Sequence, residues 1–519
     1  MKQVIRKGLK DIIVDEVPDP VASAHHVLIR PVFSLISSGT ETASIHTDSL
    51  IKEVAEKPSH LQTILNVAKT MGPLATFREV RAKFSEYAVL GYSGAGYVVG
   101  KHPTVTDLKI GDRVAYGGEG TGHGETIVTG RNLTARAPEG IKFEHAAFAT
   151  LGAIAMNAVR TAQIGLGDHV AVIGLGLVGQ LVAQLARLQG AVVTGIDLKA
   201  NRLDVARTLG AQNAIPGGAS ARDAVMGVTN GRGADVVIVA AASKSTAPAL
   251  QSVEICRDRG RIIIVGAVAM EFPWDAMYMK EIQLFMARAY GPGSYDPLYE
   301  KRGQDYPLPY VRWTENRNME EFMRLAARND VQLDPLITDR FKLDDAPAAY
   351  SKILEPDTST LAVLLEYDYV EPQDFHPKRS IPSPAASAAA PSAPTGNNEL
   401  GVALAGAGGL ARWQHLPNLK RIPGLRLSTI YSASGVRAKS YANRFGAANA
   451  VSDYDELVRD PATDIVVITS KNQEHAQQAI AALRGGKHVF VEKPMALTEE
   501  ECREIHQAVV ESGKQLTVG

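Results

Sequence analysis

Cysteine is almost absent from this sequence: Cys256 and Cys502 are the only two in 519 residues. Two cysteines exclude a disulfide framework and every structural zinc site that needs several thiolates. An excess of charge of one sign is also missing, because 55 Lys and Arg stand against 56 Asp and Glu. Without a positive field, we expect neither nucleic acid nor an anionic membrane as a partner. A small neutral ligand suits this balance better.

Long apolar runs are missing too. The first 18 residues contain no apolar signal-peptide core, and no apolar run reaches the roughly 20 residues that cross a bilayer. We therefore expect a cytoplasmic enzyme. The 45% hydrophobic and 6% aromatic residues are typical of an α/β protein, and the length predicts about three to four domains.

Proline, alanine and serine dominate residues 371–398, where large apolar residues nearly vanish. Such a composition cannot bury a core, so this segment is interpreted as a semi-extended linker between two modules. Residues 1–140 hold short strand-like runs, which predict a mostly β domain. From His169 onward apolar runs alternate with amphipathic stretches, and the same rhythm returns over residues 399–519. The alternation predicts two separate parallel sheets with crossover helices.

A glycine motif, GLGLVG, directly follows the predicted strand HVAVI. In a dinucleotide site Gly174 would make the tight turn, Gly176 would let the backbone approach the pyrophosphate, and Gly179 would permit close helix packing. Asp197 ends the next predicted strand, where a carboxylate can accept hydrogen bonds from both ribose hydroxyls. The carboxylate favours NAD by repelling a 2′-phosphate, although two cations within the next five residues keep NADP possible.

Four further stretches stand out before residue 168: VLIRPVFSLISSGTE, LGYSGAGYVVG, KIGDRVA and EHAAFATLGAIAMNAV. Together with the glycine motif they resemble the medium-chain dehydrogenase/reductase family over residues 1–367. The resemblance implies a GroES-like β domain over residues 1–140, completed by about 290–367, and a Rossmann domain over residues 141–289. It also implies hydride transfer between a nicotinamide and an alcohol, carbonyl or activated alkene.

The zinc ligands of that family are missing from the matching positions. Ser38 and Tyr92 replace the usual cysteine and histidine, and Thr150 lies where the third ligand falls. Hydroxyls are poor zinc ligands, so we expect no metal at this site. Hydrogen-bond donors would then polarise a carbonyl oxygen, and Tyr92, Ser38 and Thr40 are the candidates. Alternatively, these side chains only fill the vacated space.

Two other features allow two interpretations each. His123, in GTGHGETIV, could donate a proton near neutral pH, or it could be a structural or solvated loop residue. Residues 290–313 contain six aromatic side chains among 24 residues. These rings could stack on a sugar, or they could pack against the β domain or a second subunit.

A second motif, GAGGLA, places Gly406, Gly408 and Ala411 between a predicted strand and a helix. Together with GKHVFVEKP at residues 486–494, it resembles the Gfo/Idh/MocA family, whose members are mainly sugar or cyclitol dehydrogenases. The resemblance places Lys493 beside the nicotinamide and the reacting hydroxyl. Glu492 would orient this lysine, and the bond before the following proline is a candidate for a cis peptide.

The predicted strand ending at Tyr431 carries no carboxylate where the ribose would bind. Ser432, Ser434 and Arg437 could instead hold a 2′-phosphate, which favours NADP at this second site. His475, at the start of a predicted helix, is a further candidate near the cofactor. The substrate domain of this family is not present in the 519 residues, so we expect nucleotide binding without turnover here.

These patterns predict an α/β bi-domain oxidoreductase with two nicotinamide sites, each taking NAD or NADP, and without zinc. Its substrate would be a sugar-like alcohol or carbonyl, from polysaccharide or nucleotide-sugar metabolism, and the chain would form a homo-oligomer. A zinc-independent enone or quinone reductase is one alternative. A non-catalytic nucleotide sensor or scaffold is another.

Overall fold

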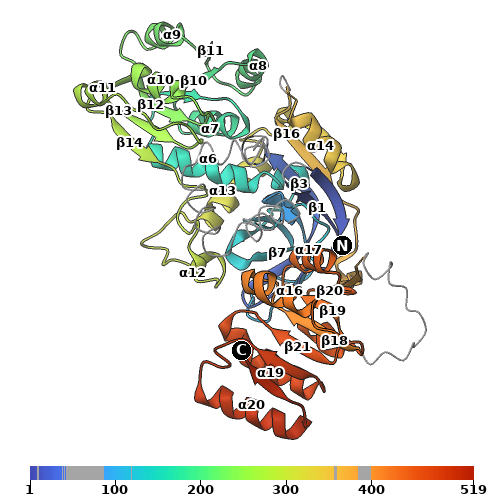
Figure 1. Ribbon diagram of the computed structural model, residues 1–519. Helices are drawn as coiled ribbons and strands as arrows, with labels where there is room; N and C mark the ends of the chain where they lie inside the picture. Colours follow the sequence, from blue (N-terminus) through green and yellow to red (C-terminus); the bar gives the residue numbers. More distant parts are fainter. Residues whose placement is uncertain are drawn as a thin grey trace.

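The computed structural model describes residues 1–8, 11–37, 39, 41, 87–118, 120–355, 359–383 and 399–519. The candidates Ser38 and Thr40 lie outside these described residues, as do residues 384–398 of the predicted linker. Figure 1 shows the described chain as an N-terminal β unit and two α/β units. None of the helices in the described ranges is long and apolar enough to cross a membrane.

The β unit is built around strand β3 (His26–Ser37). It pairs antiparallel with β5 (Ser93–Lys101) on one side and with β16 (Ala362–Glu366) on the other. The chain therefore leaves this unit and returns to it more than 200 residues later. The same sheet also contains β6 (Arg113–Gly117), β7 (Ile127–Gly130), β8 (Thr134–Arg136) and β15 (Ile337–Lys342).

A smaller sheet of the β unit has the order β2-β1-β4. Both neighbours of the central strand run antiparallel to it. Its strands are β1 (Lys2–Lys7), β2 (Asp11–Glu16) and β4 (Tyr87–Val89).

The first Rossmann unit has a parallel sheet in the order β11-β10-β9-β12-β13-β14. This is the 3-2-1-4-5-6 order of dinucleotide-binding folds, and the predicted parallel sheet is confirmed. Its central strand β9 (His169–Ile173) leads directly into helix α7 (Leu177–Leu188). The other strands are β10 (Val192–Asp197), β11 (Asn213–Pro216), β12 (Ala234–Val239), β13 (Cys256–Ile264) and β14 (Gln283–Met286). Its further helices include α8 (Ala200–Thr208), α9 (Ala221–Val228), α10 (Ala247–Ile255) and α11 (Trp274–Met279).

The second Rossmann unit repeats this order as β20-β19-β18-β21-β22-β23. Its central strand is β18 (Leu400–Ala405), which is followed by a π-helical turn, Ala411–His415, and by α16 (Leu416–Leu419). The other strands are β19 (Leu425–Tyr431), β20 (Asn449–Val451), β21 (Ile465–Ile468), β22 (His488–Val491) and β23 (Leu516–Val518). The helices that follow are α17 (Gly435–Phe445), α18 (Tyr454–Arg459), α19 (Asn472–Arg484) and α20 (Glu499–Ser512).

Part of the predicted linker belongs to the second sheet. Residues Ser380–Pro382 form strand β17, which pairs antiparallel with β20 at the edge of that sheet. Ile381 is almost fully buried and anchors the strand, and an edge strand tolerates the proline that follows it. A composition averaged over 28 residues hides this single apolar anchor.

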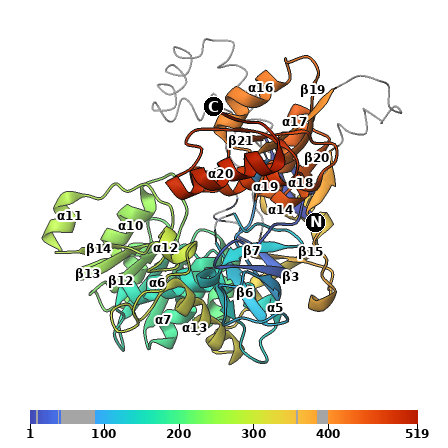
Figure 2. The same cartoon turned by 90° about the horizontal axis from the view of Figure 1, so that it is seen from below.

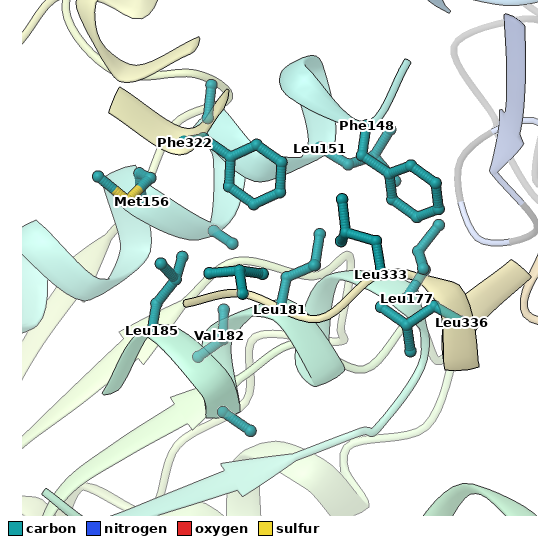
Figure 3. Close-up of a cluster of buried hydrophobic side chains, with 14 of the residues drawn as sticks. Phe148, Leu151, Met156, Leu177, Leu181, Val182, Leu185, Phe322, Leu333 and Leu336 are labelled. Carbon is teal, nitrogen blue, oxygen red and sulfur yellow. The ribbon is translucent and has the colours of Figure 1, made fainter. Parts of the chain in front are cut away.

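A layer of helices joins the β unit to the first Rossmann unit. Helices α6 (Ala149–Ala162) and α13 (Glu315–Ala327) pack against each other, and α6 also packs on α7. Phe322 occupies the space left by Gly152, since a Cβ added there would lie 2.1 Å from the ring. Figure 3 shows this ring among the leucines of the shared core. The elements that carry the first glycine motif therefore rest on a closely packed layer.

The second Rossmann unit lies against the β unit, as Figures 1 and 2 show. The contact is made by α17, which packs on strand β4 of the small sheet. The two modules are therefore joined by a packed interface as well as by the connecting chain.

Candidate cofactor and active sites

The first glycine motif has the backbone shape that a dinucleotide requires. Gly174 adopts a φ of 90°, and a Cβ there would lie 2.6 Å from the Ala241 nitrogen. A Cβ on Gly179 would lie 1.9 Å from the Gly174 oxygen, so the helix can approach the strand only because this residue is glycine. Gly176 faces open space, with no atom within 4 Å of its missing Cβ. The backbone at Gly176 is thus accessible at the start of α7.

Asp197 connects the end of β10 to this motif. One carboxylate oxygen accepts a hydrogen bond from the Leu175 N–H at 2.7 Å, and the other accepts from the Lys199 N–H at 2.9 Å. The Arg202 guanidinium also lies 3.4 Å from the carboxylate. Leu198, next to it, is 86% exposed and offers an apolar surface beside the predicted ribose site. A carboxylate held by two backbone donors is fixed in position and still has lone pairs for a ribose.

Tyr92 lies on the turn between β4 and β5 and is partly buried against the shared core. Two further phenols lie near it, Tyr290 and Tyr350. Burial raises the pKa of Tyr290 well above its usual value, and the Tyr92 phenol adds to this increase. The pKa of Tyr350 is raised in the same way by burial, then by Glu41, with a smaller contribution from Tyr92. At neutral pH these phenols keep their protons and can act as donors.

The positions that correspond to the zinc ligands do not fit zinc. Thr150 is fully buried and donates its hydroxyl to the Tyr116 carbonyl at 3.2 Å. A phenol and a hydroxyl lack the thiolate or imidazole that zinc prefers. Within the described ranges, no group of three or more His, Cys, Asp or Glu side chains gathers as a metal site.

His123 is completely buried, which favours the structural interpretation of this residue. Its Nδ1 lies 2.7 Å from the Ser34 hydroxyl, and its Nε2 lies 3.3 Å from the Glu41 carboxylate. Glu41 also accepts hydrogen bonds from the Ser37 N–H at 3.0 Å and from the Tyr350 hydroxyl. Both ring nitrogens therefore already face protein groups.

The His123 ring also supports the turn that carries Tyr92. Gly91 adopts a φ of 99°, and a Cβ there would lie 2.5 Å from Nε2 of the ring. The backbone N–H of His123 donates to the Leu90 carbonyl at 2.8 Å. Glu41 bonds to the end of β3 through the Ser37 N–H, and His123 bonds to the turn before β5 through the Leu90 carbonyl. The contact between His123 and Glu41 therefore links these two segments.

No sequence motif indicated most of this buried network. Its members come from β3, from the turn before β7, from α14 (Ala346–Ile353) and from the segment after β16. The residues that sequence analysis missed are Ser34, Glu41, Tyr350 and Tyr367, whose hydroxyl lies 2.7 Å from Ser34.

The aromatic segment 290–313 packs largely on itself and on neighbouring helices. Tyr299 stacks on Tyr306 with ring centroids 5.2 Å apart. The guanidinium groups of Arg160 and Arg312 both stack on Trp313, with their central carbons 3.4 and 3.8 Å from the ring centroid. These contacts favour the packing interpretation of the segment.

Glu315, at the start of α13, contacts this segment through Ser294. It is completely buried, and one of its oxygens accepts a hydrogen bond from the Ser294 hydroxyl at 3.1 Å. The other oxygen, Oε1, has no hydrogen-bond partner. Burial, reinforced by the Glu300 charge, raises the pKa of Glu315 to about 8. The carboxyl therefore carries a proton at neutral pH.

The second glycine motif repeats the geometry of the first. Gly406 adopts a φ of 99°, and its missing Cβ would lie 2.5 Å from the Ser470 nitrogen. Gly408 faces open space, like Gly176. Ala411 is fully buried at the start of the π-helical turn, where it replaces the third glycine.

The EKP turn of the second unit is held by two histidines. The predicted cis peptide is present between Lys493 and Pro494. His475 is buried, and its Nδ1 lies 2.8 Å from the Pro494 carbonyl. His415, which sequence analysis missed, places its Nε2 2.8 Å from the Glu492 carboxylate. The Lys493 side chain is exposed, so its proximity to a nicotinamide stays a prediction.

The predicted ribose loop of the second unit is part of the start of α17. Ser434 caps this helix, since its hydroxyl accepts from the Arg437 N–H at 3.4 Å. Ser432 is buried, whereas Ser434 and Arg437 are exposed. A cofactor phosphate could reach the last two side chains.

Two family models match the chain. Residues 178–301 match a zinc-binding dehydrogenase family, and residues 400–519 match an oxidoreductase family with an NAD-binding Rossmann fold. The chain is a two-part oxidoreductase. The first match begins inside α7, after β9, and covers the rest of the first Rossmann unit; none of the three hydroxyl residues at the zinc-ligand positions falls within it.

Individual relatives extend this comparison. D-guloside 3-dehydrogenase of Shigella flexneri is 27% identical over 364 residues, which is 68% of this chain and 96% of the relative. The 1,5-anhydro-D-fructose reductase of Ensifer adhaerens is 40% identical over 93 residues, but the match spans only 18% of this chain and 28% of that relative. Galactitol-1-phosphate dehydrogenase from Escherichia coli matches with a TM-score of 0.55 and 18% identity, over 70% of this chain and all of that structure. The first module therefore has a dehydrogenase fold.

The buried Glu315 predicts a pH-dependent stability. Its pKa is about 8 in the folded chain, against about 4.5 when unfolded, so its stabilising contribution is complete below pH 4.5 and is lost as pH rises through 8. Glu315→Gln removes this loss and should raise the melting temperature at pH 9 but not at pH 5. The gain at pH 9 should be on the order of 2–4 kcal/mol, since each pKa unit is worth about 1.4 kcal/mol.

Calorimetry across pH 5–9 measures this difference. The control is Glu139→Gln, which changes an exposed carboxylate and should leave the pH profile unaltered. Parallel profiles for the parent and Glu315→Gln would show that the buried carboxyl is not protonated at neutral pH.

Proposed function

We propose that the first module is an NAD(P)-dependent dehydrogenase that moves a hydride to or from an alcohol or carbonyl of a sugar-like substrate. The observation that carries this proposal is the open backbone at Gly176, linked to the Asp197 carboxylate through the Leu175 N–H. The similarity to D-guloside 3-dehydrogenase over nearly the whole of that relative supports a sugar as the substrate class. NAD is favoured because the carboxylate would repel a 2′-phosphate.

The chemistry of the first site would depend on hydrogen-bond donors. A bound nicotinamide supplies or accepts the hydride. The phenol of Tyr92, with the hydroxyls of Ser38 and Thr40, would polarise the substrate oxygen and stabilise a developing alkoxide. His123 would position the Tyr92 turn and would not touch the substrate.

We propose further that no zinc takes part, because the hydroxyl donors do not suit this metal. Metal analysis of the purified protein should find far less than one zinc per chain. One tightly bound zinc per chain would contradict this assignment.

The second unit would bind a nicotinamide dinucleotide at Gly406, Gly408 and Ala411, with Ser434 and Arg437 favouring NADP. Lys493 would face the reacting atoms of a substrate, with Glu492 orienting it and with His415 and His475 holding the EKP turn. Its ammonium is exposed, and nothing in the described part of the chain encloses a substrate over it. We therefore assign turnover to the first module.

A homo-oligomer is proposed because strand β14 leaves an apolar edge uncovered on the first Rossmann sheet. Phe285 is 40% exposed and Met286 is 61% exposed on this edge strand. Trp274 and Tyr278 on α11 extend the apolar surface. Unpaired edges of this kind readily add another strand, and a mass of 55.5 kDa in light scattering would contradict the proposal.

Both cysteines are free thiols, which supports a cytoplasmic location.

Removal of the Asp197 carboxylate tests the first cofactor site. Asp197→Ala should weaken NADH binding about 100-fold or more, because each of the two charge-assisted hydrogen bonds to the ribose hydroxyls is worth on the order of 1.5–3 kcal/mol. The affinity for NADPH should fall less, so the preference for NADH over NADPH should decrease. Asp197→Asn keeps an acceptor for the Leu175 N–H and separates the ribose contact from support of the motif.

Fluorescence titration with both nucleotides measures these affinities. Asp204→Ala on the same side of the sheet is the control, since that side chain is 72% exposed. Unchanged affinities in Asp197→Ala would place the ribose elsewhere.

A pair of variants identifies the working site. Gly176→Asp puts a carboxylate where the pyrophosphate would lie and should abolish dehydrogenase activity, whereas Lys493→Ala should leave it intact. NADH oxidation measured with ketosugars, enones and quinones provides the readout. It also distinguishes a sugar dehydrogenase from an enone or quinone reductase and from a protein without turnover. Loss of activity in Lys493→Ala would assign catalysis to the second unit.

A further inference from the structure

The β unit of the first module contacts the second Rossmann unit beside its predicted ribose loop. Val436, in the first turn of α17, is buried in one apolar cluster with Ile5 and Val17 of the β unit. Gly435 lies against the chain at Pro18, where an added Cβ would be 2.2 Å from the carbonyl oxygen. No side chain fits at this position while the modules are packed together.

Hydrogen bonds surround this apolar contact. The Asn443 amide of α17 donates to the Tyr87 hydroxyl at 3.2 Å, and that hydroxyl donates to Asp15. Ser452, which follows β20, donates to the Asp19 carbonyl. Asp19 also exchanges two hydrogen bonds with Lys378, at 2.8 and 2.9 Å. Defined side-chain hydrogen bonds therefore fix this interface in addition to its apolar contacts.

The residues of the ribose loop divide between the interface and the solvent. The buried members are Ser432, Gly435 and Val436, and the exposed members are Ala433, Ser434 and Arg437. The interface with the first module thus holds one side of the loop, and the other side is open to a ligand. The position of the exposed side chains depends on the contact beneath them.

We propose that the first module is a structural part of the second nucleotide site. Docking of the β unit on Gly435 and Val436 holds the loop from Ser432 to Arg437 in the shape that receives the ribose end of a nicotinamide dinucleotide. Binding at the second site and docking of the modules then strengthen each other, because coupling between two equilibria is reciprocal. This inference rests on the proposed nucleotide site at Gly406 and Gly408.

Gly435→Ala provides a selective test. Gly435 is the first residue of α17 and is not among the glycines with a positive φ, so the backbone of the second unit by itself tolerates alanine there. In the whole chain the new methyl group meets the Pro18 carbonyl and opposes docking. Val17→Ala removes apolar contact from the other side of the interface, at a residue that belongs to the β unit and not to the nucleotide site.

The measurement uses the full chain with Gly176→Asp as background, so that only the second site is expected to bind. NADPH and NADH are titrated by calorimetry, and hydrogen exchange is followed at Lys2–Lys7 and Tyr87–Val89. Gly435→Ala should weaken binding about fivefold or more, the usual lower range of coupling between sites. Val17→Ala should act in the same direction. In the background chain, added nucleotide should slow exchange in both strands.

The matched control is Gly227→Ala on α9, an exposed helical glycine with no atom within 4 Å of its missing Cβ. It should change neither affinity nor exchange. Equal affinity in the background chain and Gly435→Ala would overturn the coupling while leaving the second site intact. Weakening in Gly435→Ala without any effect of Val17→Ala would indicate a local change in the loop and would also overturn it. No binding in the background chain would overturn the proposed second site and this inference with it.

Discussion

The antiparallel pairing of β16 with β3 is the constraint on which the first module depends. It returns the chain to the β unit after the whole first Rossmann unit has been formed. The return places Tyr350 and Tyr367, from the last part of the module, on Glu41 and Ser34 from its beginning. His123 lies between them, and the turn that carries Tyr92 rests on its ring. Without this pairing the buried polar groups would lack partners, and unpaired buried polar groups are costly.

The sequence predicted both Rossmann units because their rules are local. A strand, a glycine turn and a helix follow one another within about 20 residues, and steric constraints at Gly174, Gly179 and Gly406 require the residue types that are present. The network around His123 could not be predicted in the same way. Ser34 and Tyr367 are separated by 333 residues, and neither belongs to a motif with a fixed spacing. Such contacts follow from the return of the chain and not from any local pattern.

The interface between the modules was missed for a related reason. The composition of residues 371–398 indicated a linker, and a linker suggests two independent modules. The contacts that join the modules are made by single residues inside ordinary elements: Val17 after β2, and Gly435 and Val436 at the start of a helix. Sequence rules give glycine no special role at the first position of a helix. Only the folded chain shows that here it leaves room for the Pro18 carbonyl.

Glu41 and Glu315, two of the buried carboxyl groups of the first module, avoid the cost of desolvation in different ways. Glu41 accepts hydrogen bonds from the Ser37 N–H on one oxygen and from the Tyr350 hydroxyl on the other, and it lies 3.3 Å from the His123 ring, so both of its oxygens have partners. Glu315 has one hydroxyl donor and one oxygen without a partner, and burial raises its pKa to about 8. A buried carboxyl with too few donors reduces its desolvation cost by keeping its proton. The turn that carries Tyr92 therefore rests on a carboxyl group whose two oxygens both have partners, whereas the aromatic segment rests on one that lacks a partner for Oε1.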